Sequence, residues 1–140
     1  MTTTINKGVP LIAYVEMCVA DAPVTLAYLT EGWAFRQVAV AESPGRRSVL
    51  LHNGGVPLVV TSATSSRSPI ADWVARHGDG VIDVAVYAPL HGFAERARAA
   101  GMRPVSLPPA EQRARVRVRG AGTLQHTVIE PGDDLPLLPP

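Results

Sequence analysis

The chain has 140 residues, of which 46% are hydrophobic and 18% charged, a balance typical of one globular domain. Its net charge of +1 provides no long-range field for nucleic acid or anionic lipid, so neither partner is expected. No apolar run approaches the roughly 18 residues of a membrane span, and the polar start does not resemble a signal peptide. Its single cysteine, Cys18, cannot form an internal disulfide, and we expect a cytoplasmic protein.

The first half of the chain predicts a strand, a helix and three more strands. Residues 10–19 form an apolar run rich in β-forming residues. A helix is expected to begin at Asp21, a good N-cap, and to end near Gly32, a good C-terminal stop. Turn sequences rich in Gly, Pro and Asn then separate three predicted strands, at 33–42, 47–52 and 56–62.

The second half repeats this order after a linking helix at 68–77, where Ser68 is the expected N-cap and Pro69 opens the first turn. The elements expected next are a strand at 81–87, a helix at 90–100 and strands at 102–107, 113–119 and 123–129. Two β-α-β-β-β units, about 10–62 and 81–130, constitute a structural repeat. The predicted fold class is α+β, with both modules forming a curved, incompletely closed barrel and the helices outside. The Pro-rich residues 131–140 are expected to be an extended tail.

The stretch 68–86 reads Ser-Pro-Ile-Ala-Asp-Trp-Val-Ala-Arg-His-Gly-Asp-Gly-Val-Ile-Asp-Val-Ala-Val. It resembles the middle of the N-terminal domain of 4-hydroxyphenylpyruvate dioxygenases and hydroxymandelate synthases, members of the vicinal oxygen chelate superfamily. The weaker similarities to that domain lie at 14–22, 47–51, 58–62 and 125–128. The resemblance implies the same paired-module barrel. In those enzymes iron is held by two histidines and a glutamate of a second, C-terminal domain, which has no counterpart in this sequence.

Carrying the superfamily's metal-ligand positions onto this sequence places Met17, Asp83 and Thr127 at the site. A thioether and a hydroxyl are poor substitutes for the histidine and glutamate that divalent iron or zinc requires. We therefore expect no metal and no cofactor. A metal bound through Asp83 and other, misaligned ligands remains an alternative.

Asp83 is the residue on which the functional prediction depends. It stands among apolar residues in a predicted strand, so one face of that strand carries Asp83 together with Val81 and Ala85. If this face lines the barrel interior, burial raises the pKa of Asp83 and makes it a general acid or base near neutral pH. The alternative is a structural aspartate that is bonded to the backbone or paired with an arginine.

Four arginines alternate with apolar residues along the strand 113–119, so all four lie on one side of it. The length of the following turn decides which side. A two-residue turn places the arginines with His126, and a three-residue turn places them with Gln125 and Thr127. A solvated arginine face is the favoured interpretation, because guanidinium groups crowded into a cavity repel one another. Arg117 is kept as a second-rank site residue.

The remaining candidates would contact a bound ligand rather than carry out chemistry. Besides the catalytic candidate Asp83, the predicted substrate-binding residues are Met17, Ser48, His52, Gln125, His126 and Thr127. Glu16 alternates with Met17, so it should face the helices if Met17 faces the interior, and it would then need an arginine partner.

These features predict an enzyme that binds an organic metabolite inside the barrel and acts without metal. Asp83 would transfer the proton of an isomerase, lyase or cyclase, in a role within specialised metabolism. The alternatives are a binding protein that sequesters an antibiotic or pathway intermediate, and a metal-dependent, dioxygenase-like enzyme. A homodimer is expected because the open edges of such sheets are usually covered.

Overall fold

A computed structural model of the chain describes residues 11–107 and 115–131. The first module comprises β1 (Leu11–Cys18), α1 (Ala22–Ala27), a π-helical turn η1 (Tyr28–Gly32), β2 (Arg36–Ser43), β3 (Arg46–His52) and β4 (Leu58–Ala63). The linking helix is α2 (Pro69–His77), and the second module comprises β5 (Gly80–Tyr87), α3 (Phe93–Ala99), β6 (Pro104–Val105), β7 (Arg115–Arg119) and β8 (Gln125–Ile129). Apart from Pro131, the expected tail lies outside the described residues, as does Arg113.

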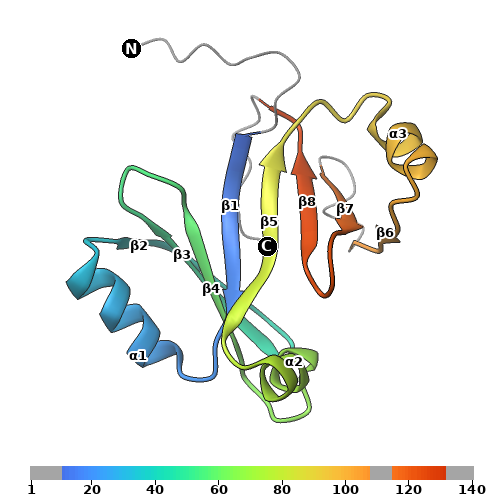
Figure 1. Ribbon diagram of the computed structural model, residues 1–140. Coiled ribbons are helices and arrows are strands. Elements are labelled where there is room, and N and C mark those ends of the chain that lie inside the picture. Colours follow the sequence, from blue (N-terminus) through green and yellow to red (C-terminus); the bar gives the residue numbers. More distant parts are fainter. Residues whose placement is uncertain (1–10, 108–114, 132–140) are drawn as a thin grey trace.

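All eight strands belong to one curved sheet, ordered β2-β3-β4-β1-β5-β8-β7-β6, which does not close into a complete barrel (Figure 1). The modules meet in the middle, where β1 and β5 pair antiparallel. Within each module the first strand pairs parallel with the last, β1 with β4 and β5 with β8. This arrangement confirms the predicted α+β class. Among the described residues, no helix has the length and apolar character needed to cross a membrane.

Helix α1 begins as the sequence predicts, because the Asp21 side chain accepts a hydrogen bond from the Val24 N–H. Its buried residue Leu26 packs with Leu29 of η1 against the outer face of the first module. The strand residues of this cluster include Val49, Leu51 and Val60. Burial of these aliphatic side chains fixes which face of each strand lies under the helix.

The other, concave face carries a different set of side chains. Strand residues alternate between faces, so Tyr14 lies on the concave face of β1 while Met17 packs with the cluster under α1. Val59, Ala85 and Ile129 form a second buried cluster with Tyr14. The concave face therefore spans both modules across the β1–β5 junction.

Candidate active site on the concave face

Asp83 lies in the middle of β5 and is buried, with only 1% of its surface exposed. One carboxylate oxygen, Oδ1, accepts a hydrogen bond from the Thr127 N–H at 3.0 Å. The other, Oδ2, accepts one from the Thr127 hydroxyl at 2.5 Å. The Nε atom of Arg117 lies 3.6 Å from Oδ2 and donates to the Thr127 hydroxyl oxygen at 2.9 Å. We call these three residues the Asp83 cluster.

Burial raises the pKa of Asp83 above its ordinary value of 3.8, because the charged form loses its hydration. The hydrogen bonds from Thr127 and the charge of Arg117 oppose this rise. Asp83 thus has features of a structural aspartate, because it is bonded to the backbone and lies close to an arginine. It also has the raised pKa expected of a general acid or base. A carboxyl group whose pKa is raised holds its proton more tightly than an exposed aspartate, which suits it to exchange a proton with a substrate.

A second carboxylate, Glu16, lies directly opposite Asp83, because the two residues are register partners of β1 and β5. Its Oε2 atom accepts hydrogen bonds from Arg46 and from the Thr61 hydroxyl, both at 2.6 Å. The Ser48 hydroxyl lies 2.7 Å from that of Thr61. We call Glu16, Arg46, Ser48 and Thr61 the Glu16 cluster. In antiparallel sheets, side chains directly opposite one another have Cβ atoms about 5 Å apart, so the two clusters adjoin.

The positions of Glu16 and Met17 reverse the sequence prediction. Glu16 faces the concave side, and Met17 faces helix α1 and therefore lies apart from the Asp83 cluster. The inward-facing residue of β1 is Glu16, one position before the Met17 that the superfamily alignment predicts, and a shift of one residue exchanges the two faces of a strand. Glu16 pairs with an arginine, Arg46, but it does so on the concave face and not on the helix-bearing face where the sequence placed it.

Sequence reasoning missed Tyr14, which is 3% exposed on the same face as Glu16. Burial raises the pKa of Tyr14 to about 12, and the negative charges of Asp83 and Glu16 add to the rise. The phenol therefore keeps its proton and can act only as a neutral hydrogen-bonding group. Its signal in the sequence was its spacing of two residues from Glu16, once that residue is placed inward.

The favoured interpretation of β7 as a solvated arginine face is wrong for two of its arginines. Arg119 pairs with Gln125 and Arg117 with Thr127, so the arginines share the concave side with Gln125 and Thr127. Arg115 is only 5% exposed, whereas Arg119 is exposed. A hydrogen bond from the Gly120 N–H to the Leu124 carbonyl leaves residues 121–123 as a three-residue turn. A three-residue turn is the length that places the arginines on the same face as Gln125 and Thr127.

Two predicted ligand contacts lie apart from the clusters. His126 alternates with Thr127 and lies on the outer face, where its Nδ1 atom is 2.9 Å from the Val84 carbonyl oxygen. His52 ends β3, and its Nδ1 accepts a hydrogen bond from the Gly54 N–H within the following loop. The structure thus assembles Asp83 with Thr127, Arg117, Glu16, Ser48 and, by alternation, Gln125.

The superfamily's usual metal does not fit these side chains. Within residues 11–107 and 115–131, no three His, Cys, Asp or Glu side chains are grouped so that they could hold a metal ion. Thr127 already donates to both oxygens of Asp83, and the Oε2 atom of Glu16 already accepts from Arg46 and from the Thr61 hydroxyl. A guanidinium beside each carboxylate places positive charge where a cation would have to bind.

No family model matches the chain. A triple mutant of 4-hydroxymandelate synthase from Streptomyces coelicolor is similar in structure, with a TM-score of 0.78 and 34% identity over 92% of this chain. The match spans only 38% of that protein. The methylmalonyl-CoA epimerase of Mycobacterium tuberculosis has a TM-score of 0.69 and 20% identity, over 95% of this chain and 94% of the epimerase.

A Streptomyces coelicolor methylmalonyl-CoA epimerase variant, in complex with 2-nitronate-propionyl-CoA, has a TM-score of 0.65 and 15% identity over 87% of this chain and 97% of its own. At such low identity the epimerases show that the fold is shared and nothing more. The synthase match is closer in sequence, and both groups of structures are vicinal oxygen chelate proteins. This chain is therefore a member of the vicinal oxygen chelate superfamily, related within it to the hydroxymandelate synthases and 4-hydroxyphenylpyruvate dioxygenases.

Proposed function

We propose that the protein is a metal-independent enzyme that moves a proton on a small organic metabolite, as an isomerase, lyase or cyclase. The observation that carries this proposal is the cross-strand pairing of two carboxylates, Glu16 and Asp83, on the concave face. Their surroundings differ in a way that suits acid–base chemistry. Asp83 has a raised pKa, and Glu16 is held in an ion pair with Arg46. Pairs of titratable groups in unlike environments commonly divide the roles of acid and base.

In the proposed mechanism Asp83 exchanges the proton, and arginines stabilise the charge that develops on the substrate. A proton lost from carbon beside a carbonyl group leaves negative charge on the carbonyl oxygen, which preorganised donors stabilise. The side chains of Arg46 and Arg117 are 34% and 20% exposed, so they form the accessible parts of the two clusters. A substrate on the concave face would meet these guanidinium groups first.

The fold shared with methylmalonyl-CoA epimerases supports this reaction class, because epimerisation removes a proton from carbon and returns it. We propose a role in specialised metabolism, which the similarity to a Streptomyces hydroxymandelate synthase supports. Location in the cytoplasm and assembly as a homodimer are part of the same proposal.

The proposal is tested by hydrogen exchange into the substrate. Methylmalonyl-CoA and 4-hydroxyphenylpyruvate serve as probes in D2O, and mass spectrometry follows deuterium incorporation. The full chain should catalyse exchange on at least one probe. Asp83→Asn should slow that exchange by about 100-fold or more, the usual contribution of a general acid or base, while probe affinity is retained. Asp72→Asn, at an exposed position in the first turn of α2, is the matched control. Undiminished exchange in Asp83→Asn would remove the proposed role.

One observation favours a binding protein as the second candidate. Asp83 is only 1% exposed and both of its oxygens already accept hydrogen bonds, as expected of a residue that only supports the binding surface. Probe binding without exchange by the wild-type chain would favour this candidate. Metal analysis of protein purified without chelator is a separate check, because a stoichiometric metal would contradict the metal-independent mechanism.

A further inference from the structure

Two arginines stand directly opposite each other at the outer end of the second module. The register of β6 and β7 pairs Pro104 with Val118 and Val105 with Arg117. The next pair in this series is Arg103 and Arg119, and the Arg119 N–H donates to the Arg103 carbonyl oxygen at 2.8 Å. Residues opposite one another in an antiparallel pair place their side chains on the same face.

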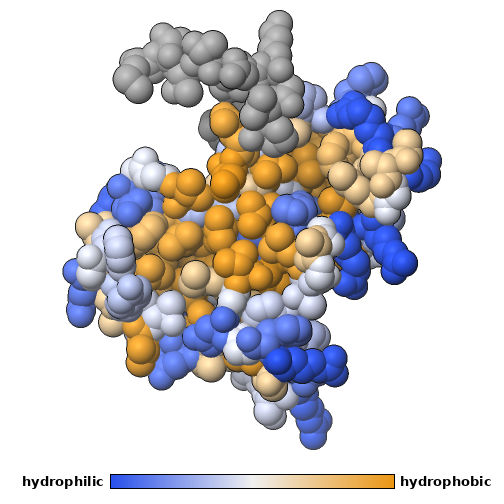
Figure 2. Space-filling view, viewed as in Figure 1, coloured by the Kyte–Doolittle hydropathy of each residue, from blue (hydrophilic) through white to orange (hydrophobic). Residues whose placement is uncertain are grey.

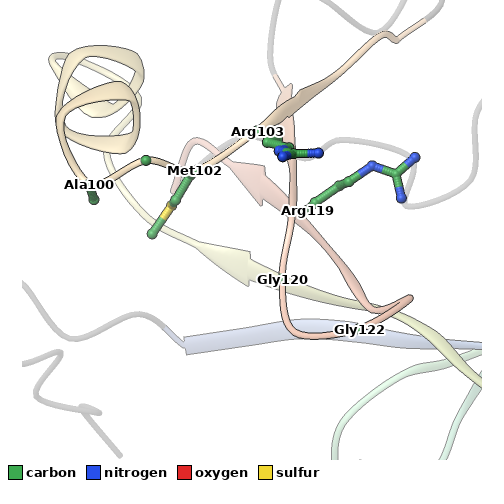
Figure 3. Close-up of a pocket in the computed structure, with 7 residues that line it drawn as sticks. Ala100, Met102, Arg103, Arg119, Gly120 and Gly122 are labelled. Atoms are coloured by element: carbon green, nitrogen blue, oxygen red, sulfur yellow. The ribbon is translucent and has the colours of Figure 1, made fainter.

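Both arginine side chains extend to the same side of their strands, while Met102 points to the other side (Figure 3). Both residues are exposed and line a shallow pocket of about 370 Å³ between the α3–β6 turn and the β7–β8 turn. The pocket is not filled by neighbouring side chains. A Cβ atom added at Gly101 or Gly122, which also line it, would meet nothing within 4 Å.

Like charges directly opposite each other destabilise a sheet. Among the residues that the structure describes, three ion pairs occur, and none includes Arg103 or Arg119. An anion between the two guanidinium groups would remove this repulsion and bind both. Arginine is the residue best suited to this task, because its planar donors match the oxygens of a phosphate or carboxylate.

We propose that Arg103 and Arg119 form a binding site for the phosphate group of a small molecule. The two positive charges of the guanidinium groups match the two negative charges of a phosphate dianion. A carboxylate has only one negative charge and would leave one guanidinium charge unbalanced. The site is independent of the chemistry proposed for Asp83.

The position of the site also relates it to the concave face. Arg119 pairs with Gln125, and Gln125 with Asp83, so the three residues form one row across β7, β8 and β5. At the usual strand spacing the ends of this row are about 10 Å apart. A phosphorylated substrate bound at Arg103 and Arg119 would therefore extend towards Asp83, a consequence that rests on the proposed function.

The test is a titration of the full chain with inorganic phosphate in low-salt buffer, followed by amide NMR shifts. We expect saturable shifts at Arg103, Arg119 and Gly120. Arg103→Gln and Arg119→Gln should each weaken binding by about tenfold or more, the loss of a charge-assisted hydrogen bond. Arg98→Gln on the exposed face of α3 removes the same charge and should leave the affinity unchanged.

If Arg98→Gln weakens phosphate binding as much as the two site variants do, or if amide shifts occur at every surface arginine, phosphate acts only by charge screening. Either result would contradict a specific site at Arg103 and Arg119. Acetate is titrated in parallel, and acetate binding as tight as that of phosphate would overturn the assignment to phosphate. Asp83→Asn should bind phosphate with wild-type affinity. Failure of the phosphate site is therefore distinguishable from failure of the proton-transfer proposal, which is measured by deuterium exchange.

Discussion

The carboxyl group of Asp83 binds its proton more tightly in the folded chain than in the unfolded chain, because burial raises its pKa above the ordinary 3.8. Between the pKa of Asp83 in the unfolded chain and its pKa in the folded chain, the native state holds more protons than the unfolded state. Raising the pH in this range therefore lowers the free energy of unfolding. The contribution of Asp83 to the free energy of unfolding is complete below about pH 3.8, the pKa in the unfolded chain. It is lost as the pH rises through the pKa in the folded chain.

Asp83→Asn cannot titrate at this position and should lack this pH dependence. Urea unfolding of both proteins, from pH 3.5 to 8, measures the difference in unfolding free energy, wild type minus variant. We expect this difference to fall as the pH rises above about 4 and to level off above the folded pKa of Asp83. A difference that grows with pH would mean that Asp83 is stabilised as a carboxylate, which contradicts the raised pKa.

Thr61 is fully buried and donates to Glu16 at 2.6 Å, so its hydroxyl satisfies a carboxylate that is only 8% exposed. Thr61→Val keeps the shape and removes this donor. Leaving a buried charged acceptor short of a hydrogen bond should lower the free energy of unfolding by about 1–3 kcal/mol. Thr64→Val, at an exposed position, should change it by less than about 0.5 kcal/mol. Urea denaturation at pH 7 makes the comparison, and equal effects at both positions would contradict the role of Thr61.

The β7–β8 hairpin is the element whose turn orients the arginine strand. Gly120 follows β7, and a Cβ atom built there would lie 2.7 Å from His126 Nε2 and 2.8 Å from its Cδ2. Gly120→Ala therefore forces the imidazole ring out of its place beside the Val84 carbonyl oxygen. We expect a loss of about 1–3 kcal/mol in the free energy of unfolding, the usual cost of overpacking.

Gly32→Ala is the matched control, because an added Cβ there meets nothing within 4 Å. Thermal or urea unfolding should show no loss of stability for this variant. A double variant that combines Gly120→Ala with His126→Ala should be less destabilised than the sum of the two single changes, because the clash is then absent. Full additivity would show that His126 is not the obstacle.

The order of elements and the place of Asp83 within a strand could be predicted from the sequence, because caps, turns and period-two alternation are local signals. Helix α1 with its Asp21 cap and α2 at Pro69–His77 follow these signals. The faces of β1 and β7 could not be predicted in this way. A shift of one residue exchanges Glu16 with Met17, and one more residue in the turn at 121–123 brings Arg117 inward. Such choices depend on strand pairing across the whole sheet.

The molecule as a whole has two unlike faces. The concave face carries buried carboxylates and arginines, whereas the helix-bearing face is apolar over β1 and β5 between α1 and α3 (Figure 2). Half-buried aliphatic residues of these strands include Val15, Met17, Ile82, Val84 and Val86. Large exposed apolar areas usually mark contact surfaces. A second copy of the chain, related by a twofold axis, would cover both apolar areas at once and leave both concave faces open.

Val84→Lys places a charge in this apolar area and should convert the expected homodimer into a monomer, because a buried unpaired charge is costly at an interface. Light scattering with size-exclusion chromatography measures the mass, and circular dichroism verifies that the variant is folded. Val38→Lys, on the edge strand β2 where Val38 is 53% exposed, is the control for a general effect of added charge. If Val38→Lys alone dissociates the dimer, pairing occurs along the open edge of the sheet instead. A monomeric wild-type chain at millimolar concentration would contradict the homodimer itself.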